Sequence, residues 1–416
     1  MEIARDGYLQ KLIGARHNGL IKIITGLRRV GKSYLLFTIF KNYLLVQGVA
    51  EDHIIEISFE SIENEHLREP HAVYDHVLKM AKDKEQYYVL LDEIQYVDRF
   101  TEVLNGFLHH KNLDVYVTGS NSRMLSKDVL TEFRGRGDEI RVYPLSFGEF
   151  YAARQGDVYE ALDEYFLYGG LPRILQLATD EEKINYLKNI FSETYYRDLL
   201  ERHKVAHIDD FNDLINILAS GVGSLTNPNK LEKTFASVKK STITAKTIKN
   251  YLEYLEDAFL LSKALRYDVK GKRYINTPLK YYFTDVGLRN ARLGFRQVEN
   301  NHLMENIIYN ELCYRGFQVD IGMVELREKD VAGKFQKIQL EIDFIATKGN
   351  KKYYFQSVYM MPDITKEKQE TRPMLKVKDT FQKFLIVYNH QKPGVSGDGV
   401  ITLSLKDFLL SSNFDI

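Results

Sequence analysis

Residues 26–33, GLRRVGKS, contain two glycines separated by four residues and followed by Lys-Ser. In the pattern G-x-x-x-x-G-K-[ST], backbone N–H groups turn inward around phosphate oxygens. A Cβ at Gly31 would obstruct that approach, Lys32 would reach the β- and γ-phosphates, and Ser33 would ligate Mg²⁺. The spacing therefore predicts a site for a magnesium nucleotide, ATP or ADP. The predicted binding residues are Gly26, Arg28, Arg29, Val30, Gly31, Lys32, Ser33 and Tyr34.

The flanking residues favour this interpretation over an ordinary turn with a solvated lysine. The apolar run IKIIT at 21–25 is typical of a buried strand, and YLLFTIF at 34–40 predicts a helix. A helix that begins here would direct its positive N-terminal dipole at the phosphates. Arg28 and Arg29 lie outside the consensus. They either shield nucleotide charge or face solvent and bind a partner.

A second segment, YYVLLDEIQYV at residues 87–97, supplies an acidic pair. Its continuous apolar run is typical of a central parallel strand that is buried on both faces. Asp92 and Glu93 follow at the carboxyl end of this strand. We predict that Asp92 is the carboxylate on the metal side and that Glu93 is the base that polarises the attacking water.

A third strand, LDVYVTGS at residues 113–120, leads into Asn121. Ligands of open parallel sheets bind at the carboxyl ends of the strands. Ser120 or Asn121 would then orient the water or contact the γ-phosphate. Helix capping explains both residues equally well, because Ser and Asn cap the helix that RMLSKDVL predicts.

The composition limits the remaining classes of function. The 416 residues carry 57 Lys and Arg against 57 Asp and Glu, so any nucleic-acid surface must be local. The single cysteine, Cys313, excludes an internal disulfide framework and a cysteine-rich zinc site. The first residues lack the apolar core of a signal peptide, and no uncharged apolar run reaches the roughly 18 residues of a membrane span. We expect a cytoplasmic protein without a membrane partner.

Five segments occur in a fixed order over residues 1 to about 175: IKIITGLRRVGKSYLL, YVLLDEIQYV, YVTGSNSRML, FRGRGDEIRVYPLSFGEFY and YGGLPRIL. Together they resemble the prokaryotic AAA+ ATPases that carry a C-terminal domain of unknown function numbered 4143. The resemblance implies an α/β fold with the parallel sheet of a P-loop NTPase, over residues 1–150, and a helical lid over 151–200. It also implies Mg²⁺-dependent hydrolysis of ATP to ADP and phosphate, slow without a partner, and a possible homo-oligomer.

The same resemblance implies two further site residues. An arginine that stabilises charge on the γ-phosphate, in its own or a neighbouring subunit, is best matched by Arg136, with Arg134 and Arg141 nearby. Pairing with Asp138 or Glu139 would explain Arg136 as well. Pro172, in YGGLPRIL, would lie near the adenine, although a plain turn is the alternative.

Residues 201–290 predict a winged-helix-like domain, because short helices precede a possible hairpin at SKALRYDVKGKRYI. Thr244 is the expected N-cap of the second helix, and Lys246, Lys249 and Asn250 would face outward. These side chains would contact DNA or a protein, or form only a solvated helix face.

Residues 295–416 predict an α/β domain whose helix–hairpin–helix–strand order resembles the PD-(D/E)xK nuclease core. Glu305, Asp343 and Gln356 match its metal-binding positions, but Val358 occupies the lysine position. Lys351 or Lys352 would have to substitute. We therefore expect an inactive, nuclease-like fold used for binding. A nucleotide-gated adaptor or DNA-binding module with negligible turnover is the main alternative function, and an ATP-driven nuclease is a weaker one.

Overall fold

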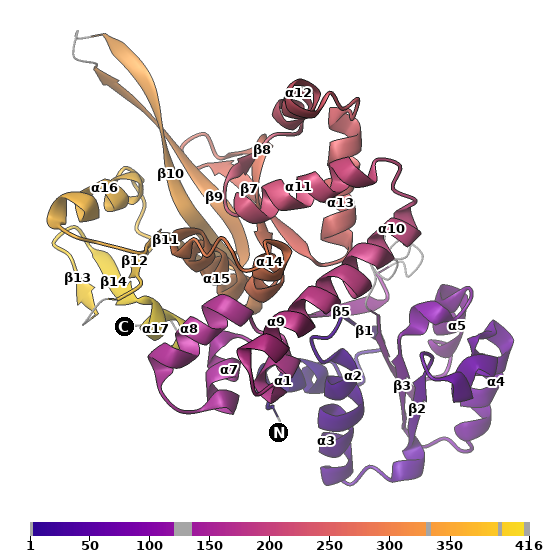
Figure 1. Ribbon diagram of the computed structural model, residues 1–416. Coiled ribbons are helices and arrows are strands. Elements are labelled where there is room, and N and C mark those ends of the chain that lie inside the picture. The colour runs from indigo at the N-terminus through magenta and orange to yellow at the C-terminus, as the bar shows by residue number, and fades with distance from the viewer. Residues whose placement is uncertain (1–2, 120–134, 330–333, 390–392, 412–416) are drawn as a thin grey trace. The chain divides into compact units, whose positions relative to one another are not determined.

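The computed structural model describes residues 3–119, 135–329, 334–389 and 393–411 (Figure 1). The chain divides into two compact units. The first comprises Met1–Pro144 with Asp257–Phe259, and the second comprises Leu145–Glu256 with Leu260–Ile416.

The first unit contains a five-stranded sheet with the order β2-β3-β4-β1-β5, in which all neighbouring strands are parallel. A π-helical turn, Leu35–Phe40, joins α2 to α3. The elements are α1 Asp6–Gly14, β1 Ile21–Gly26, α2 Lys32–Tyr34, α3 Lys41–Val46, β2 Ile54–Ser58, α4 Pro70–Met80, β3 Tyr87–Asp92, α5 Phe100–Phe107, β4 Leu113–Thr118 and β5 Gly137–Val142.

The parallel register brings together the carboxyl ends of β1, β3 and β4, which carry the predicted site residues. Strands β1 and β3 are buried along their whole length, as their apolar runs predict. Strand β4 lies between them, with Ile24 opposite Thr118 and Leu91 opposite Val117. The phosphate loop, the acidic pair and the end of β4 therefore meet at the carboxyl edge of this sheet.

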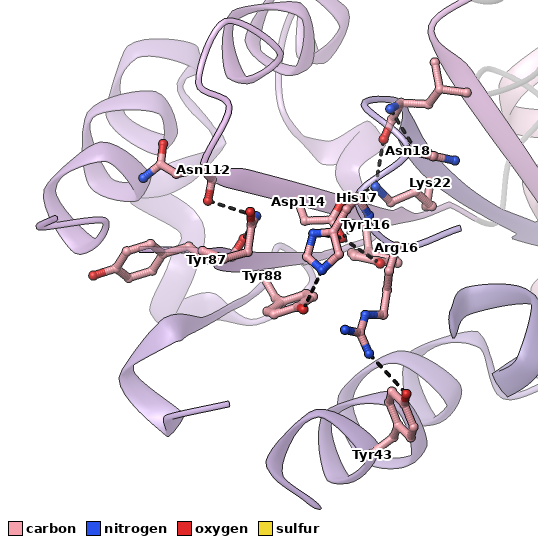
Figure 2. A network of polar contacts seen from close by, with 12 residues as sticks. Arg16, His17, Asn18, Lys22, Tyr43, Tyr87, Tyr88, Asn112, Asp114 and Tyr116 are labelled. Carbon is pink, nitrogen blue, oxygen red and sulfur yellow. Dashed lines mark hydrogen bonds and ion pairs between the residues drawn. The ribbon is translucent and has the colours of Figure 1, made fainter. Parts of the chain in front are cut away.

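A buried ion pair lies at the opposite, amino-terminal end of the same sheet (Figure 2). Lys22 is fully buried, and its Nζ contacts Asp114 Oδ1 and donates to the Leu20 carbonyl at 2.8 Å. Asp114 Oδ2 accepts hydrogen bonds from the Tyr116 hydroxyl at 2.9 Å and from the His17 backbone N–H at 3.2 Å. The lysine within IKIIT is thus a paired core residue.

Asp114→Asn should destabilise the protein by roughly 3–5 kcal/mol, because it leaves the buried ammonium of Lys22 without its counter-charge. The double variant Lys22→Met/Asp114→Asn should recover part of this loss, since no buried charge remains. Urea unfolding followed by circular dichroism measures both effects. A loss of less than about 1 kcal/mol, the scale of an exposed pair, would contradict the assignment.

The second unit contains a nine-stranded mixed sheet with the order β13-β14-β12-β11-β10-β9-β7-β8-β6. Helix α15 packs on one face of this sheet, where its Tyr309 contacts Phe344 of β10. Helix α16 packs on the other face through Met374. The elements are α7 Phe147–Arg154, α8 Val158–Tyr168, α9 Asp180–Asn189, α10 Arg197–His203, α11 Ile208–Ser220, β6 Leu225–Thr226, α12 Pro228–Lys239, α13 Ala245–Asp257, β7 Leu261–Asp268, β8 Arg273–Phe283, α14 Val286–Arg292, α15 Asn300–Tyr314, β9 Gln318–Lys329, β10 Phe335–Lys348, β11 Lys351–Val358, α16 Ile364–Leu375, β12 Lys383–Val387, β13 Gly394–Val395, β14 Val400–Ser404 and α17 Leu405–Leu410.

Apart from Asp257–Phe259, the residues of the three domains predicted over 151–200, 201–290 and 295–416 lie in this one compact unit. The expected order of helices followed by a β7–β8 hairpin is present in the middle segment. Strand β7, however, also pairs in parallel with β9, from Arg266 opposite Ile321 to Asp268 opposite Met323. This pairing gives the outer edge of the hairpin a partner and merges the two predicted domains into one sheet. The division between the two units falls after Pro144.

Two segments, YGGLPRIL (residues 168–175) and KYYFTDVGLRN (residues 280–290), interlock within the second unit, and we call them the landmarks. The Gly170 N–H donates to Asp285 Oδ2 at 2.7 Å, and Asp285 Oδ1 caps α14 through the Leu288 N–H at 3.0 Å. A Cβ on Gly169 would lie 2.3 Å from Asp285 Oδ1, and one on Gly287 would lie 2.0 Å from the Tyr168 carbonyl oxygen. These glycines permit close backbone packing, so the landmarks have a structural role.

Candidate nucleotide-binding site

The loop after β1 has the backbone conformation that its glycines predict. Gly26 and Gly31 have φ angles of 137° and 91°, in the region that disfavours side chains. A Cβ at Gly26 would lie 2.1 Å from the Val142 carbonyl oxygen, so neighbouring β5 requires that glycine. No protein atom of the described residues lies within 4 Å of a Cβ placed at Gly31. The second glycine thus faces open space, where phosphate oxygens would approach its N–H.

Lys32 lies inside the loop rather than in solvent. Its side chain is buried, and Nζ donates to the carbonyl oxygens of Gly26 and Leu27 at 3.1 Å each. Burial lowers the pKa of Lys32 to about 8, while the nearby carboxylates of Glu93 and Asp92 oppose the shift. The lysine therefore remains mostly charged at pH 7. It places a desolvated cation where the pattern predicts the phosphates.

Asp92, the last residue of β3, is hydrogen-bonded both to residues 26–33 and to the end of β4. Its Oδ1 accepts a hydrogen bond from Ser33 Oγ at 2.8 Å and another from Thr118 Oγ1 at 2.5 Å. Burial raises the pKa of Asp92, and the hydrogen bonds from Thr118 and Ser33 oppose that shift. Hydroxyl and carboxylate oxygens are the hard ligands that Mg²⁺ prefers. Ser33 and Asp92 therefore fit a magnesium site.

Glu93 has a strained backbone at the end of β3. Its φ of 55° lies in the left-handed region, which residues other than glycine rarely adopt. The Glu93 N–H donates to Thr118 Oγ1 at 3.0 Å, and Gln95 Nε2 donates to the Glu93 carboxylate. The half-buried carboxylate of Glu93 lies near enough to Lys32 for its charge to act on the lysine.

Thr118 is the site residue that the sequence interpretation missed. It bridges both members of the acidic pair, although it lies 26 residues from Asp92 in the chain. The sequence feature that could have identified it is a hydroxyl side chain at the carboxyl end of the apolar strand that ends in YVT. Ser120 and Asn121, which were predicted for this edge, lie outside the described residues.

The two extra arginines of the loop differ in their surroundings. Arg28 is half-buried, and its charge is near enough to Lys32 to help lower the lysine pKa. Arg29 is exposed, with a φ of 66°. Val30 is buried, whereas Tyr34 is 40% exposed. Arg28 is thus the arginine that is placed beside the predicted phosphates.

Arg136 lies at the amino-terminal edge of its sheet. Its carbonyl oxygen accepts a hydrogen bond from the Ile21 N–H at 2.9 Å, whereas the phosphate loop begins after Gly26. Ile21 and Gly26 are five positions apart in β1, which corresponds to about 17 Å along the strand. The acids considered as its partners bond elsewhere, since Asp138 accepts from Asn18 and Glu139 from Thr25. Within one subunit, Arg136 and the phosphate loop are therefore at opposite ends of β1.

Pro172 belongs to the second unit, where it begins a short 3₁₀ turn, Pro172–Gln176. The ring is half-buried, and Leu171 before it is fully buried. Its predicted place beside the adenine stays a prediction.

A second polar cluster gathers the residues predicted from the nuclease pattern. Gln356 Nε2 donates to Asp343 Oδ1 at 3.1 Å, and the charge of Glu305 acts on Asp343. Lys280 Nζ contacts Glu305 Oε1 at 2.9 Å and Glu341 Oε1 at 2.7 Å. Burial, reinforced by Glu305, raises the pKa of Asp343 to about 7.

The cation of this cluster comes from β8 and not from β11. Val358 packs in an apolar core with Met374, Lys351 is exposed, and Lys352 lies near Asp379 at 3.9 Å. Burial alone would lower the pKa of Lys280, but its carboxylate neighbours outweigh burial and raise it. Across the described part of the chain, no group of three His, Cys, Asp or Glu side chains is arranged to hold a metal ion. Within this cluster, Lys280 pairs with the carboxylates of Glu305 and Glu341.

Lys280→Met should destabilise the protein more at pH 8 than at pH 5. The Lys280 ammonium opposes the raised pKa of the buried Asp343 carboxyl, so its loss raises that folded-state pKa further above the unfolded value. The folded state then binds more protons, so its stability falls as pH rises. Urea unfolding at both pH values tests this against Lys263→Met, which removes a half-exposed β7 lysine. An equal loss at both pH values would contradict it.

Comparison with known proteins identifies the first part of the chain. Residues 18–151 match the AAA domain, and residues 159–299 match a domain of unknown function, DUF8612. The number 4143 expected for the C-terminal domain is thus not confirmed. Among the described residues, no helix is long and apolar enough to cross a membrane.

The relatives extend over nearly the whole chain. An uncharacterized protein of Haemophilus influenzae is 35% identical over 414 residues, 98% of each chain. An uncharacterized protein of Methanocaldococcus jannaschii is 28% identical over 365 residues, covering 84% of this chain and 77% of that protein. The solved structure of the Aeropyrum pernix ORC1 protein in complex with DNA aligns with 70% of this chain and 92% of its own. Its 13% identity and TM-score of 0.31 are too low to support an argument about this chain.

Proposed function

We propose that this chain, which belongs to the same family as the Haemophilus influenzae protein and carries an AAA domain, is a Mg²⁺-dependent ATPase. The observation that supports it best is the hydrogen bond of 2.8 Å between Ser33 of the loop and Asp92 of the acidic pair. These two residues come from segments 59 positions apart. Their contact brings the residues predicted to bind phosphate and those predicted to bind metal to one edge of the sheet.

Each residue of this edge then has a separate task. Backbone N–H groups of residues 26–33 and the ammonium of Lys32 would hold the phosphates. Ser33 and Asp92 would hold Mg²⁺, which when bound offsets charge on the β- and γ-phosphates. Thr118 fixes the Asp92 carboxylate. Glu93 would accept a proton from the attacking water.

Arg136 would complete the site of a neighbouring subunit, because its own loop lies at the other end of β1. The experiment that tests the proposal measures ATP turnover across a range of protein concentrations, with and without DNA. Turnover per subunit should rise with concentration and fall in Arg136→Ala. If purified protein neither binds nor hydrolyses ATP in the presence of Mg²⁺, the proposal fails.

A nucleotide-gated adaptor with negligible turnover is the second candidate, and one contact favours it. Gln95 Nε2 donates to the carboxylate of Glu93, so the base is engaged by its own loop. An adaptor would retain nucleotide through purification and would differ in protease sensitivity between ATP and ADP, as the second unit is rearranged. Rapid multiple turnover without a partner would contradict this candidate.

A further inference from the structure

Strands β9 and β10 continue past the rest of their sheet as a projecting pair of strands (Figure 1). We call residues 325–329 and 335–339 the ribbon. Their register is continuous and antiparallel, from Glu325 opposite Gln339 to Lys329 opposite Phe335. The neighbouring strands of the sheet pair only outside the ribbon. Strand β7 pairs with β9 as far as Met323, and β11 pairs with β10 from Phe344 onward. The ribbon therefore presents two faces of its own.

The two faces of the ribbon have different chemistry. Directly opposed residues share a face, and successive residues of a strand alternate between faces, so the register assigns each residue to one face. One face carries Leu326 and Ile338, which are half-buried, and Glu328, which pairs with Arg372 of α16 at 2.5 Å. The open face carries Arg327, Lys329, Phe335, Lys337, Glu325 and Gln339. Of these, Arg327, Lys329 and Lys337 are exposed, and Glu325 is half-buried.

The open face contains one pairing that does not stabilise the ribbon. Arg327 lies directly opposite Lys337, and like charges in that position are destabilising, although Lys337 also pairs with Glu325 at 2.9 Å. Phe335 is 71% exposed, with Lys329 Nζ 5.4 Å from its ring centre. Departures from stable local pairing are expected at surfaces that have a function.

Further cations lie beside the base of the ribbon. Lys270, in the turn between β7 and β8, donates from Nζ to the Glu325 carbonyl oxygen at 3.2 Å. Lys272 follows in the same turn, Arg273 begins β8, and both are exposed. The open face, this turn and Arg273 together carry six cations, against the carboxylates of Asp268 and Glu325. In a chain with 57 cations and 57 acids, this is a local positive excess.

We propose that the open face of the ribbon binds the phosphate backbone of double-stranded DNA, with the ribbon entering the major groove. That groove, about 12 Å wide, admits a two-stranded β-ribbon. Lysine and arginine side chains at its rim bind phosphates and release counterions. A narrow projection suits a groove better than the flat surface of an anionic bilayer. The proposal does not depend on ATP hydrolysis.

The ribbon is a different surface from the one predicted on α13. There, Lys246 and Lys249 are exposed as expected, but Lys249 lies 3.8 Å from Glu253, and Asn250 is half-buried. The two lysines of this helix, set against Glu253, give a smaller positive excess than the six cations set against two carboxylates around the ribbon, where Lys337 pairs with Glu325.

The test measures fluorescence anisotropy of a short labelled DNA duplex with the full chain, without nucleotide. Arg327→Gln/Lys337→Gln should weaken binding by roughly tenfold or more at low salt. It should also reduce the slope of log affinity against log salt by about 2, one for each lost phosphate contact. Lys246→Gln/Lys249→Gln removes the same charge from α13 and should bind as the wild type does. The charge-conserving variant Arg327→Lys/Lys337→Arg should retain binding.

Several results would overturn the proposal. These are no duplex binding by the wild type, unchanged binding or salt slope in the ribbon variant, and loss of binding in the α13 variant instead. Selective loss of binding to phosphatidylserine vesicles would identify a membrane surface. Unchanged duplex binding with increased aggregation would show that the charges only protect exposed strand edges. Because nucleotide is absent, failure here leaves the proposed ATPase activity untouched.

Discussion

Glu93→Gln should abolish most ATP hydrolysis and leave ATP binding intact. The amide keeps the size of the side chain but cannot accept the proton of the attacking water. General bases contribute roughly 100- to 10,000-fold to turnover, and we expect kcat to fall within that range. Phosphate release measures turnover, and calorimetric titration with ATP and Mg²⁺ measures binding.

Glu102→Gln is the matched control for this variant. It makes the same chemical change at an exposed position of α5, where Glu102 pairs with Arg99 at 3.4 Å. Its kcat should equal that of the wild type. If Glu93→Gln retains more than about a tenth of wild-type turnover, then Glu93 is not the base. If it also loses ATP binding, the residue positions the loop instead.

Lys32→Ala should greatly weaken ATP binding and reduce hydrolysis with it. The Lys32 ammonium is the buried cation inside the loop, and charge-assisted bonds to phosphate are the strong ones there. We expect a loss of affinity of roughly 100-fold, about 2.7 kcal/mol. Calorimetric titration with ATP and Mg²⁺ checks this value.

Lys41→Ala provides the comparison, because it removes a lysine of the same unit that pairs with Glu56 at 2.5 Å. Its ATP affinity should match that of the wild type, and circular dichroism should show both variants folded. Tight ATP binding by folded Lys32→Ala protein would exclude residues 26–33 as the phosphate site.

Much of the nucleotide site could be predicted because its signals are local. The loop residues Gly31, Lys32 and Ser33 are neighbours in the chain, and Asp92 with Glu93 directly follows a buried strand. A parallel sheet aligns the carboxyl ends of its strands, so these segments were expected at one edge. The structure places them there, with Ser33 bonded to Asp92.

Other features depend on strand pairings that no local spacing encodes. Thr118 bridges the acidic pair only because β4 lies beside β3, and Lys280 pairs with Glu305 and Glu341 only because β8 passes α15 and β10.

The sequence by itself determined the phosphate loop and its acidic partner, since each is a continuous segment with its own chemistry. The tertiary structure alone decided that Arg136 lies at the far end of β1, that the predicted winged helix shares a sheet with the last domain, and that a charged ribbon projects from it. The physical reason is that strand order and register are set by hydrogen bonds between segments far apart in the chain.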